Sequence, residues 1–194
     1  MKTCAKGSIL AFLCEYCDGS TPVPITDVVP KVFRLMLHHV YGGDISAAKW
    51  KDHVKDLLEA SDKYGLTNLK IEAEVRYVKL LKFLADDVAE AVSYAQKMNC
   101  FLLKEAAIEF IVANVDEVLA PDTFENIPES KDIIQGILCS VATMNKKGQH
   151  KNDCEDLNQI SINHLRARLA FLGKDFDGSK ETLIARLKGA NSSE

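Results

Sequence analysis

The chain has 194 residues, of which 47% are hydrophobic and 27% are charged. This composition is ordinary for a globular protein of one or two domains, and no apolar run approaches the roughly 20 residues of a membrane-spanning helix. The net charge of −4 is unevenly spread, because residues 146–194 carry nine basic and seven acidic residues and the preceding residues are net acidic. The body is therefore expected to repel nucleic acid, and the C-terminal segment is not.

The first residues, MKTCAKGSILAFLC, resemble a secretory signal only weakly. Their apolar core covers about six residues, whereas such signals use about 7–15. The six cysteines are scattered along the chain, unlike those of a small disulfide scaffold. We therefore expect a reducing intracellular compartment, the nucleus and/or the cytoplasm.

Patterns in the first half predict a short strand followed by helices. PVPIT, residues 22–26, is typical of an edge strand because it contains two prolines. VFRLMLHHVYGG predicts a helix over residues 32–43 that ends at a Gly-Gly pair. Residues 54–64 predict the next helix, with Gly65 as its left-handed cap, and Asn68 is expected to cap a further helix. The helical spacing of one methionine and three aromatic residues predicts that their side chains belong to the core: Phe33, Met36, Tyr41 and Tyr64.

The second half predicts more helices and a boundary. A helix is expected to open at Asp86 or Asp87, and another to begin near Phe101. Because their connection is short, we expect an antiparallel pair. A further helix is predicted over residues 130–144, and the polar residues 145–156 are typical of a linker.

The final stretch predicts a pair of short helices. Apolar side chains recur at steps of three or four, which places them on one helix face: Ile162, Leu165, Leu169 and Leu172. Gly173 is suited to end this helix, and Ser179 to begin the next.

The segment from Val23 to about Leu119 resembles the BTB/POZ domain continuing into a BACK or three-box helical extension. The resemblance is carried by VFRLMLHHVYGGDI, LLEASDKYGLTNLKIEAE, ADDVAEAVSYAQKMNC and LLKEAAIEFIVANVDEV. It implies a mainly α fold with a partial α/β body. It also implies a substrate adaptor of a cullin-type ubiquitin ligase, whose ligase-facing surface involves residues 32–41, 54–64 and 86–114.

The N-terminus departs from this family. The complete domain places strands and a long helix ahead of the segment that resembles residues 1–13, and they supply most of its homodimer surface. The chain is thus expected to be N-terminally truncated relative to the family, as a truncated gene product or with an uncovered core. The homodimerisation of the family is therefore not assumed to hold for this chain.

The stretch LRARLAFLGKDFDGSKETLIARL resembles a SAP motif, a helix–extended–helix module that binds DNA. Gly173, Gly178 and Lys180 match its pattern, as do Leu183, Ile184, Arg186 and Leu187. Lys174 stands where the family has leucine, and Phe176 is expected to fill that apolar space. A helix N-terminus at Ser179 suits a phosphate. The predicted nucleic-acid-binding residues are Arg166, Arg168, Lys174, Ser179, Lys180, Arg186 and Lys188. The alternative is that these charges form a solvated helix face.

Catalytic and metal-binding patterns are weak. Cys14 and Cys17 form a C-x-x-C, but the adjacent His38 and His39 diverge by about 100° on a helix, and His150 and Cys154 lie in the polar linker. No P-loop, Gly-x-Ser-x-Gly, Gly-x-Gly-x-x-Gly or His-Glu-x-x-His occurs. We therefore predict no enzyme, cofactor or metal.

The sequence predicts a noncatalytic interaction adaptor with a weak nucleic-acid tether for DNA or RNA, and no membrane. The predicted divisions are a partial BTB/POZ-like domain (residues 1–85), a helical extension (86–144), a linker (145–156) and a SAP-like module (157–190). Protein partners would be a cullin scaffold and a substrate protein. The alternatives are a chromatin-associated DNA-binding or structural protein without a ligase role, and a nonfunctional fragment.

Overall fold

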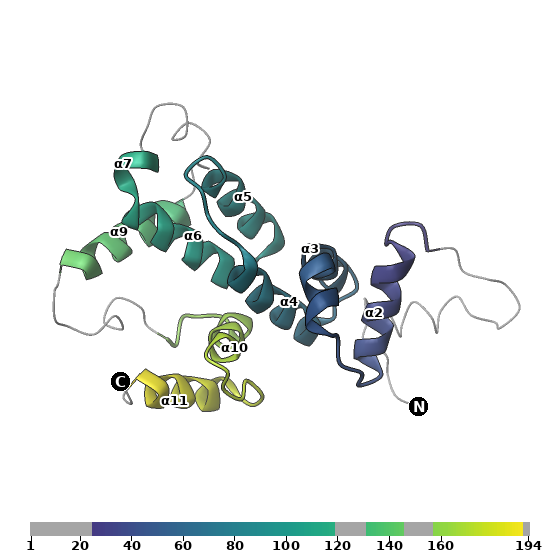
Figure 1. Cartoon of the computed structure of the whole chain (residues 1–194). Coiled ribbons are helices and arrows are strands. Elements are labelled where there is room, and N and C mark those ends of the chain that lie inside the picture. Colours follow the sequence, from purple (N-terminus) through teal and green to yellow (C-terminus); the bar gives the residue numbers. More distant parts are fainter. Residues whose placement is uncertain (1–24, 119–130, 146–156, 192–194) are drawn as a thin grey trace, which may run out of the picture. The chain divides into compact units, whose positions relative to one another are not determined.

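The computed structural model describes residues 25–118, 131–145 and 157–191 (Figure 1). Over these residues the chain is helical and contains no strand, which confirms the prediction of a mainly α fold. Most of the predicted edge strand, residues 22–26, lies outside them. The described helices include none that is both long enough and apolar enough to cross a membrane.

Two compact units make up the chain, Met1–Tyr77 and Val78–Glu194. The sequence placed its first boundary at residues 85/86 and a linker at residues 145–156, whereas the second compact unit includes both the helical extension and the C-terminal pair. The four-part division stays a prediction.

The first unit is built from α2 (Pro30–Val40), α3 (Ala47–Lys63) and most of α4 (Thr67–Leu80). Pro30 occupies the first position of α2, where its missing N–H removes no intrahelical bond. Helices α2 and α3 pack together and bury apolar side chains: Val32, Leu35, Met36, Val54, Leu57 and Leu58. Helix α3 begins seven residues before the predicted start, and Asn68 lies within the first turn of α4 instead of capping it.

The end of α3 agrees with its prediction. Gly65 has φ +66°, a left-handed conformation that costs glycine little because it has no Cβ. The N–H of Leu66 then donates to the carbonyl of Ser61 at 2.8 Å. This bond satisfies a carbonyl that the helix end would leave unpaired.

The exposure of two aromatic residues in the first unit, Tyr41 and Trp50, does not follow from their local sequence. Tyr41 is 82% exposed because it follows the last turn of α2, so its prediction as core was wrong. Trp50, in a polar sequence, is only 2% exposed, and the guanidinium carbon of Arg76 lies 4.8 Å from the centre of its ring. The aliphatic part of an arginine side chain covers apolar surface well, so a polar neighbourhood in sequence does not exclude a packed Trp.

The second unit is centred on α5 (Val88–Met98) and α6 (Phe101–Ala113), which lie side by side as the predicted antiparallel pair (Figure 1). Asn99 makes the tight connection at φ +50°. α9 (Lys131–Asn145) and the short α7 (Val115–Val118) complete the core, whose buried members are Val88, Val92, Ala107, Ile111, Val118 and Ile133. Gly136 of α9 approaches α6 so closely that a Cβ would lie 2.6 Å from Cδ1 of Ile108.

The C-terminal pair consists of α10 (Ile162–Phe171) and α11 (Lys180–Asn191). It has a small core of its own, formed by Leu165, Leu169, Leu183, Ile184 and Leu187. Phe176 packs against this core, as predicted from the fact that Lys174 stands where the SAP family has leucine. Ile162 and Leu172 are 37% and 48% exposed, so the predicted apolar face was wrong at both ends, and Leu157 and Ile160 pack in their place.

The predicted helix ends of this pair are also observed. Gly173 has φ +66°, and the N–H of Lys174 donates to the carbonyl of Leu169 at 2.9 Å. The Ser179 hydroxyl accepts from the N–H of Thr182 at 3.4 Å. Ser161, which the sequence analysis did not single out, caps α10 in the same way by accepting from the N–H of His164.

Two glycines of the pair provide a matched test of backbone conformation. A Cβ added at Gly173 or at Gly189 would meet no atom within 4 Å, so sterics with neighbours play no part. Because Gly173 is left-handed, Gly173→Ala should lower the free energy of unfolding by about 1 kcal/mol. Gly189 is helical, so Gly189→Ala should raise it by roughly 0.5–1 kcal/mol. Urea unfolding followed by circular dichroism measures both, and equal effects of the two variants would contradict the assignment.

Candidate functional site

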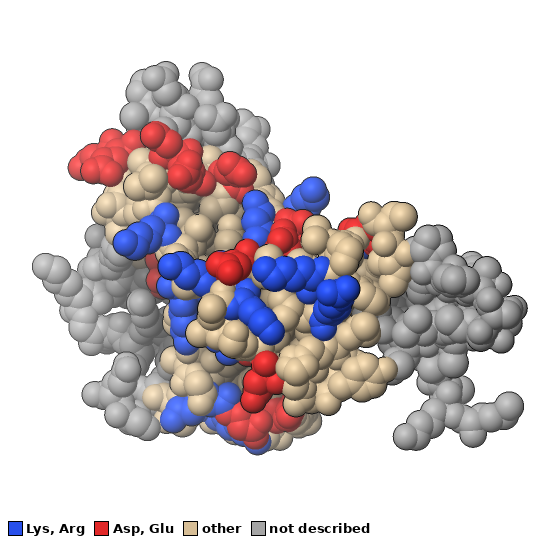
Figure 2. All heavy atoms as spheres, turned by 45° about the vertical axis from the view of Figure 1, so that its right-hand side comes forward, with Lys and Arg blue, Asp and Glu red and all other residues tan. Residues whose placement is uncertain are grey.

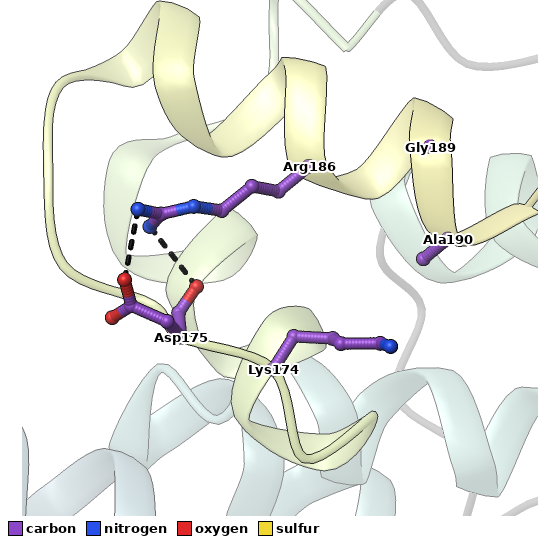
Figure 3. Close-up of a pocket in the computed structure, with 5 residues that line it drawn as sticks. All are labelled: Lys174, Asp175, Arg186, Gly189 and Ala190. Carbon is purple, nitrogen blue, oxygen red and sulfur yellow. Dashed lines mark hydrogen bonds and ion pairs between the residues drawn. The ribbon is translucent and has the colours of Figure 1, made fainter.

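The seven predicted nucleic-acid-binding residues lie on α10, on α11 and in the loop between them. Two of them, Lys174 and Arg186, line one surface hollow of about 370 Å³ together with Asp175, Gly189 and Ala190 (Figure 3). The hollow is therefore not purely cationic, since it includes a carboxylate. The seven residues do not converge on a single point.

Arg186 holds the connecting loop in place. Its guanidinium donates to the backbone carbonyls of Asp175 at 3.1 Å and Asp177 at 2.5 Å, and it also pairs with the Asp175 carboxylate at 2.8 Å. Figure 3 shows the side chain reaching from α11 across to Asp175. These contacts use the planar fork of the guanidinium for the loop, so a phosphate would compete with them.

Other members of the set are placed differently from one another. The Lys180 ammonium donates to the carbonyl of Asn158 at 2.6 Å, and the Ser179 hydroxyl caps α11. Lys188 is exposed near the end of α11. Lys174 is exposed too, and its side chain makes no hydrogen bond or ion pair with the described residues. It extends toward the end of α11 in Figure 3.

Arg168 contacts α6. Its guanidinium pairs with the carboxylate of Glu105, with Nε 3.0 Å from Oε1 and 3.3 Å from Oε2 and with the terminal Nη2 also on Oε1. Nε2 of His164 lies 2.6 Å from the same Oε1. Since a carboxylate only accepts, Nε2 carries the proton. The His164 ring stacks on Phe101, with the ring centres 4.7 Å apart and the planes inclined by 10°.

Two hydrogen-bond donors, His164 and Arg168, set the ionisation of Glu105. Burial raises the pKa of this carboxyl, but the hydrogen bonds from His164 and Arg168 outweigh burial and hold the pKa below its ordinary value. The side chains are 32% exposed for Glu105, 23% for Arg168 and 14% for His164. The contact is therefore partly shielded from water and from screening by salt.

Sequence reasoning missed this cluster. Phe101 and Glu105 are four residues apart on α6, and His164 and Arg168 are four apart on α10, so each pair shares one helix face. That spacing is the only local signal, and nothing in it indicates that the two faces meet. Arg166, on the same helix, has its Nε buried and without a hydrogen-bond partner.

Figure 2 draws one face of the molecule, and charge on that face is mixed. In the view of Figure 2, Lys and Arg side chains share the drawn face with Asp and Glu side chains.

The predicted ligase-facing residues fall on two helices of the first unit and on a helix pair of the second. Residues 32–41 correspond to α2, 54–64 to the latter part of α3, and 86–114 to α5 and α6. The first two lie in the first unit and the pair in the second. The exposed apolar side chains of α2 and its two ends include Val29, Val40 and Tyr41.

The candidate metal ligands are only partly described. Cys14, Cys17, His150 and Cys154 lie outside the described residues. His38 is on α2, where its Nε2 lies 3.2 Å from the carbonyl oxygen of Asp44. Among the described residues, no group of three or more His, Cys, Asp or Glu side chains is arranged to hold a metal ion.

Comparison with known proteins supports the BTB/POZ resemblance. The BTB/POZ domain model matches residues 11–81. The chain is 28% identical over 137 residues to BTB/POZ and MATH domain-containing protein 3 of Arabidopsis thaliana, an alignment that covers 64% of this chain and 33% of that protein. No solved structure matches. The predicted BTB/POZ resemblance is thus confirmed over residues 11–81, whereas the BACK or three-box extension, the SAP motif and the truncation stay predictions.

Animal relatives are similar to the same extent. The chain is 28% identical over 110 residues to TD and POZ domain-containing protein 1-like of Mus musculus, covering 57% of this chain and 30% of that protein. It is 23% identical over 112 residues to BTB and MATH domain-containing protein 40 of Caenorhabditis elegans, covering 58% and 27%. The aligned part spans about a third or less of the curated relatives. It also exceeds the domain match, so the similarity extends beyond residues 11–81.

The lowered pKa of Glu105 makes the stability of the second unit depend on pH. The carboxylate stabilises the fold above its ordinary pKa of 4.5, and this contribution is lost as the pH falls through the lowered value. Glu105→Gln should therefore lower the free energy of unfolding by about 1–3 kcal/mol at neutral pH, and by progressively less in acid. Urea unfolding across this pH range measures the difference.

Asp116→Asn is the matched control, because Asp116 is an exposed acid on α7 of the same unit. It should change stability by no more than about 0.5 kcal/mol at any pH. A deficit of Glu105→Gln that stays constant down to acid pH would show that the charge of Glu105 is not its cause.

Proposed function

We propose that this chain is a noncatalytic protein-interaction adaptor. The observation that carries the proposal is the BTB/POZ match over residues 11–81, since proteins of this family serve as interaction modules. The first unit offers a surface formed by helices α2 and α3, and the exposed Tyr41 supplies an aromatic side chain of the kind enriched in protein interfaces. Such a protein contributes proximity between its partners and takes no part in bond making.

A more specific form of the proposal is a substrate adaptor for a cullin-type ubiquitin ligase. The family resemblance suggests that α2, the latter part of α3 and the α5–α6 pair face the ligase. Several relatives combine BTB/POZ with a second named domain, MATH or TD, which fits a modular arrangement of scaffold contact and target contact. The target protein would be recognised elsewhere than on the ligase-facing helices.

Binding to a purified cullin scaffold tests this form directly. The full chain should bind with a Kd in the micromolar range or tighter, measured by biolayer interferometry. Tyr41→Ala should weaken binding by about tenfold or more, because a central aromatic contact is worth at least about 1–2 kcal/mol. Leu138→Ala is the control, since Leu138 is an exposed apolar residue of α9, outside the proposed surface. Absence of binding at micromolar concentrations, or equal loss in both variants, would contradict it.

A second candidate function, weak tethering to nucleic acid, is favoured by the C-terminal pair. Its helix ends and small core form as the SAP resemblance implies, and Lys174 is exposed at the hollow beside α11. Arg168 and Arg186, however, contact carboxylates within the chain. The expected affinity is that of nonspecific binding, with Kd on the order of 10⁻⁴–10⁻⁶ M at physiological salt.

Titration of a labelled DNA duplex at two salt concentrations tests the tether. Lys174→Gln should weaken binding by a few fold and reduce the salt slope by about one, as expected for the loss of one phosphate contact. Lys51→Gln, which removes an exposed lysine from α3 of the first unit, should leave both unchanged. If the two lysine variants behave alike, the C-terminal pair is not the contact.

A further inference from the structure

The contact between α6 and α10 occupies an arginine that a phosphate would otherwise bind. Arg168 places Nε and Nη2 against the Glu105 carboxylate, which is the planar two-atom recognition that guanidinium groups also use for phosphate. Glu105 therefore stands in the position of a phosphate. The charge of Arg168 is permanent, so it is neutralised only by an anion beside it.

Burial strengthens this competition. The side chain of Arg168 is 23% exposed and that of His164 only 14%. The stacking of His164 on Phe101 covers the same face of α10 from α6. A phosphate group of a duplex therefore reaches the guanidinium fork of Arg168 only after α10 has moved away from α6.

The C-terminal pair is built so that such a movement leaves it folded. Its buried leucines and Ile184 pack against one another between α10 and α11, and both helices carry their own N-terminal caps, Ser161 and Ser179. On the side of the helical extension, α10 is held by the polar cluster and by Lys79, whose ammonium lies 5.2 Å from the centre of the Phe171 ring. The contacts that would break include an ion pair, hydrogen bonds and ring contacts, whereas the core that keeps the pair together is apolar.

We propose that the contact of Phe101 and Glu105 with His164 and Arg168 is an autoinhibitory latch, which covers part of the nucleic-acid-binding face of the C-terminal pair. The inference rests on the proposed nucleic-acid tethering. A nucleic acid binds the open form, in which Arg168 exchanges the Glu105 carboxylate for a backbone phosphate. The apparent affinity is then reduced by the fraction of molecules that are open.

The latch predicts that neutralising Glu105, which is far in sequence from the C-terminal pair, increases the affinity of the chain for duplex DNA. If about a tenth of the molecules are open, Glu105→Gln should tighten duplex binding about tenfold and steepen the salt slope by about one, since one more cation contacts phosphate. Asp116→Asn removes the same charge from the same unit without touching α10, and should change affinity less than twofold. Adding Arg168→Ala to Glu105→Gln should cancel the gain.

A second readout follows the latch without nucleic acid. Stacking on Phe101 shifts the ring protons of His164 upfield in the proton NMR spectrum, and the chain has only five histidines, so a His164→Gln variant assigns the signal. In the full-length chain, Glu105→Gln should move this signal toward that of a free imidazole. Addition of a 20-base-pair duplex to the unmodified chain should move it in the same direction.

The outcomes separate the latch from the tether. An unmoved His164 signal in Glu105→Gln overturns the latch. If the His164 signal moves in Glu105→Gln but this variant binds the duplex no more tightly than Asp116→Asn does, the contact masks no binding residue. That result also overturns the latch. If neither the unmodified chain nor any variant binds the duplex, the proposed nucleic-acid tethering is wrong, and the proposed masking of Arg168 is wrong as well. A moved signal together with the gain and its cancellation supports the proposal.

Discussion

Helix α6 is the element on which the second unit depends. It buries apolar side chains on more than one face, and a helix that is apolar around most of its circumference must be covered on several sides. Helix α5 covers one side, α9 another, and α10 contacts it as well. A short chain segment of thirteen residues thus fixes where three other helices lie within the unit.

Because α6 is so apolar, its one carboxylate facing α10 has a large effect. A partly buried anion is costly unless cations and hydrogen bonds compensate it. Arg168 and His164 provide that compensation, and their hydrogen bonds hold the pKa of Glu105 below its ordinary value. The basic character of the C-terminal pair thereby has a structural use inside the protein, in addition to any use outside it.

Local chemistry explains which features were predictable from sequence. Gly65, Gly173 and Ser179 were assigned correctly because a left-handed cap or a hydroxyl cap is decided by a few neighbouring residues. The exposure of side chains at the ends of helices was not predictable. Tyr41 and Leu172 have the same helical spacing as the core residues, but they lie past the last turn that other elements cover. Likewise, the buried Trp50 has the guanidinium of Arg76, from the next helix, over its ring.

The candidate site was only partly predictable for the same reason. The sequence identified the cations of the C-terminal pair but not their partners, since Glu105 precedes Arg168 by 63 residues. Arg186 is occupied more locally, by a loop whose conformation follows from Asp175 and Gly178 rather than from a helical period. The close approach of Gly136 to Ile108 is likewise a property of two packed helices and has no signature in either one.

These internal contacts change how an adaptor and a tether would work together. A tether with few available cations binds too weakly to select a site, but it raises the local concentration of whatever the adaptor holds. On the proposed latch, its strength would depend on how often α10 leaves α6, a movement that the ion pair and hydrogen bonds of Glu105 oppose. If α10 leaves α6 as proposed, a partner that touched the α6 face would alter nucleic-acid binding without contacting nucleic acid, because both would act on the same contact.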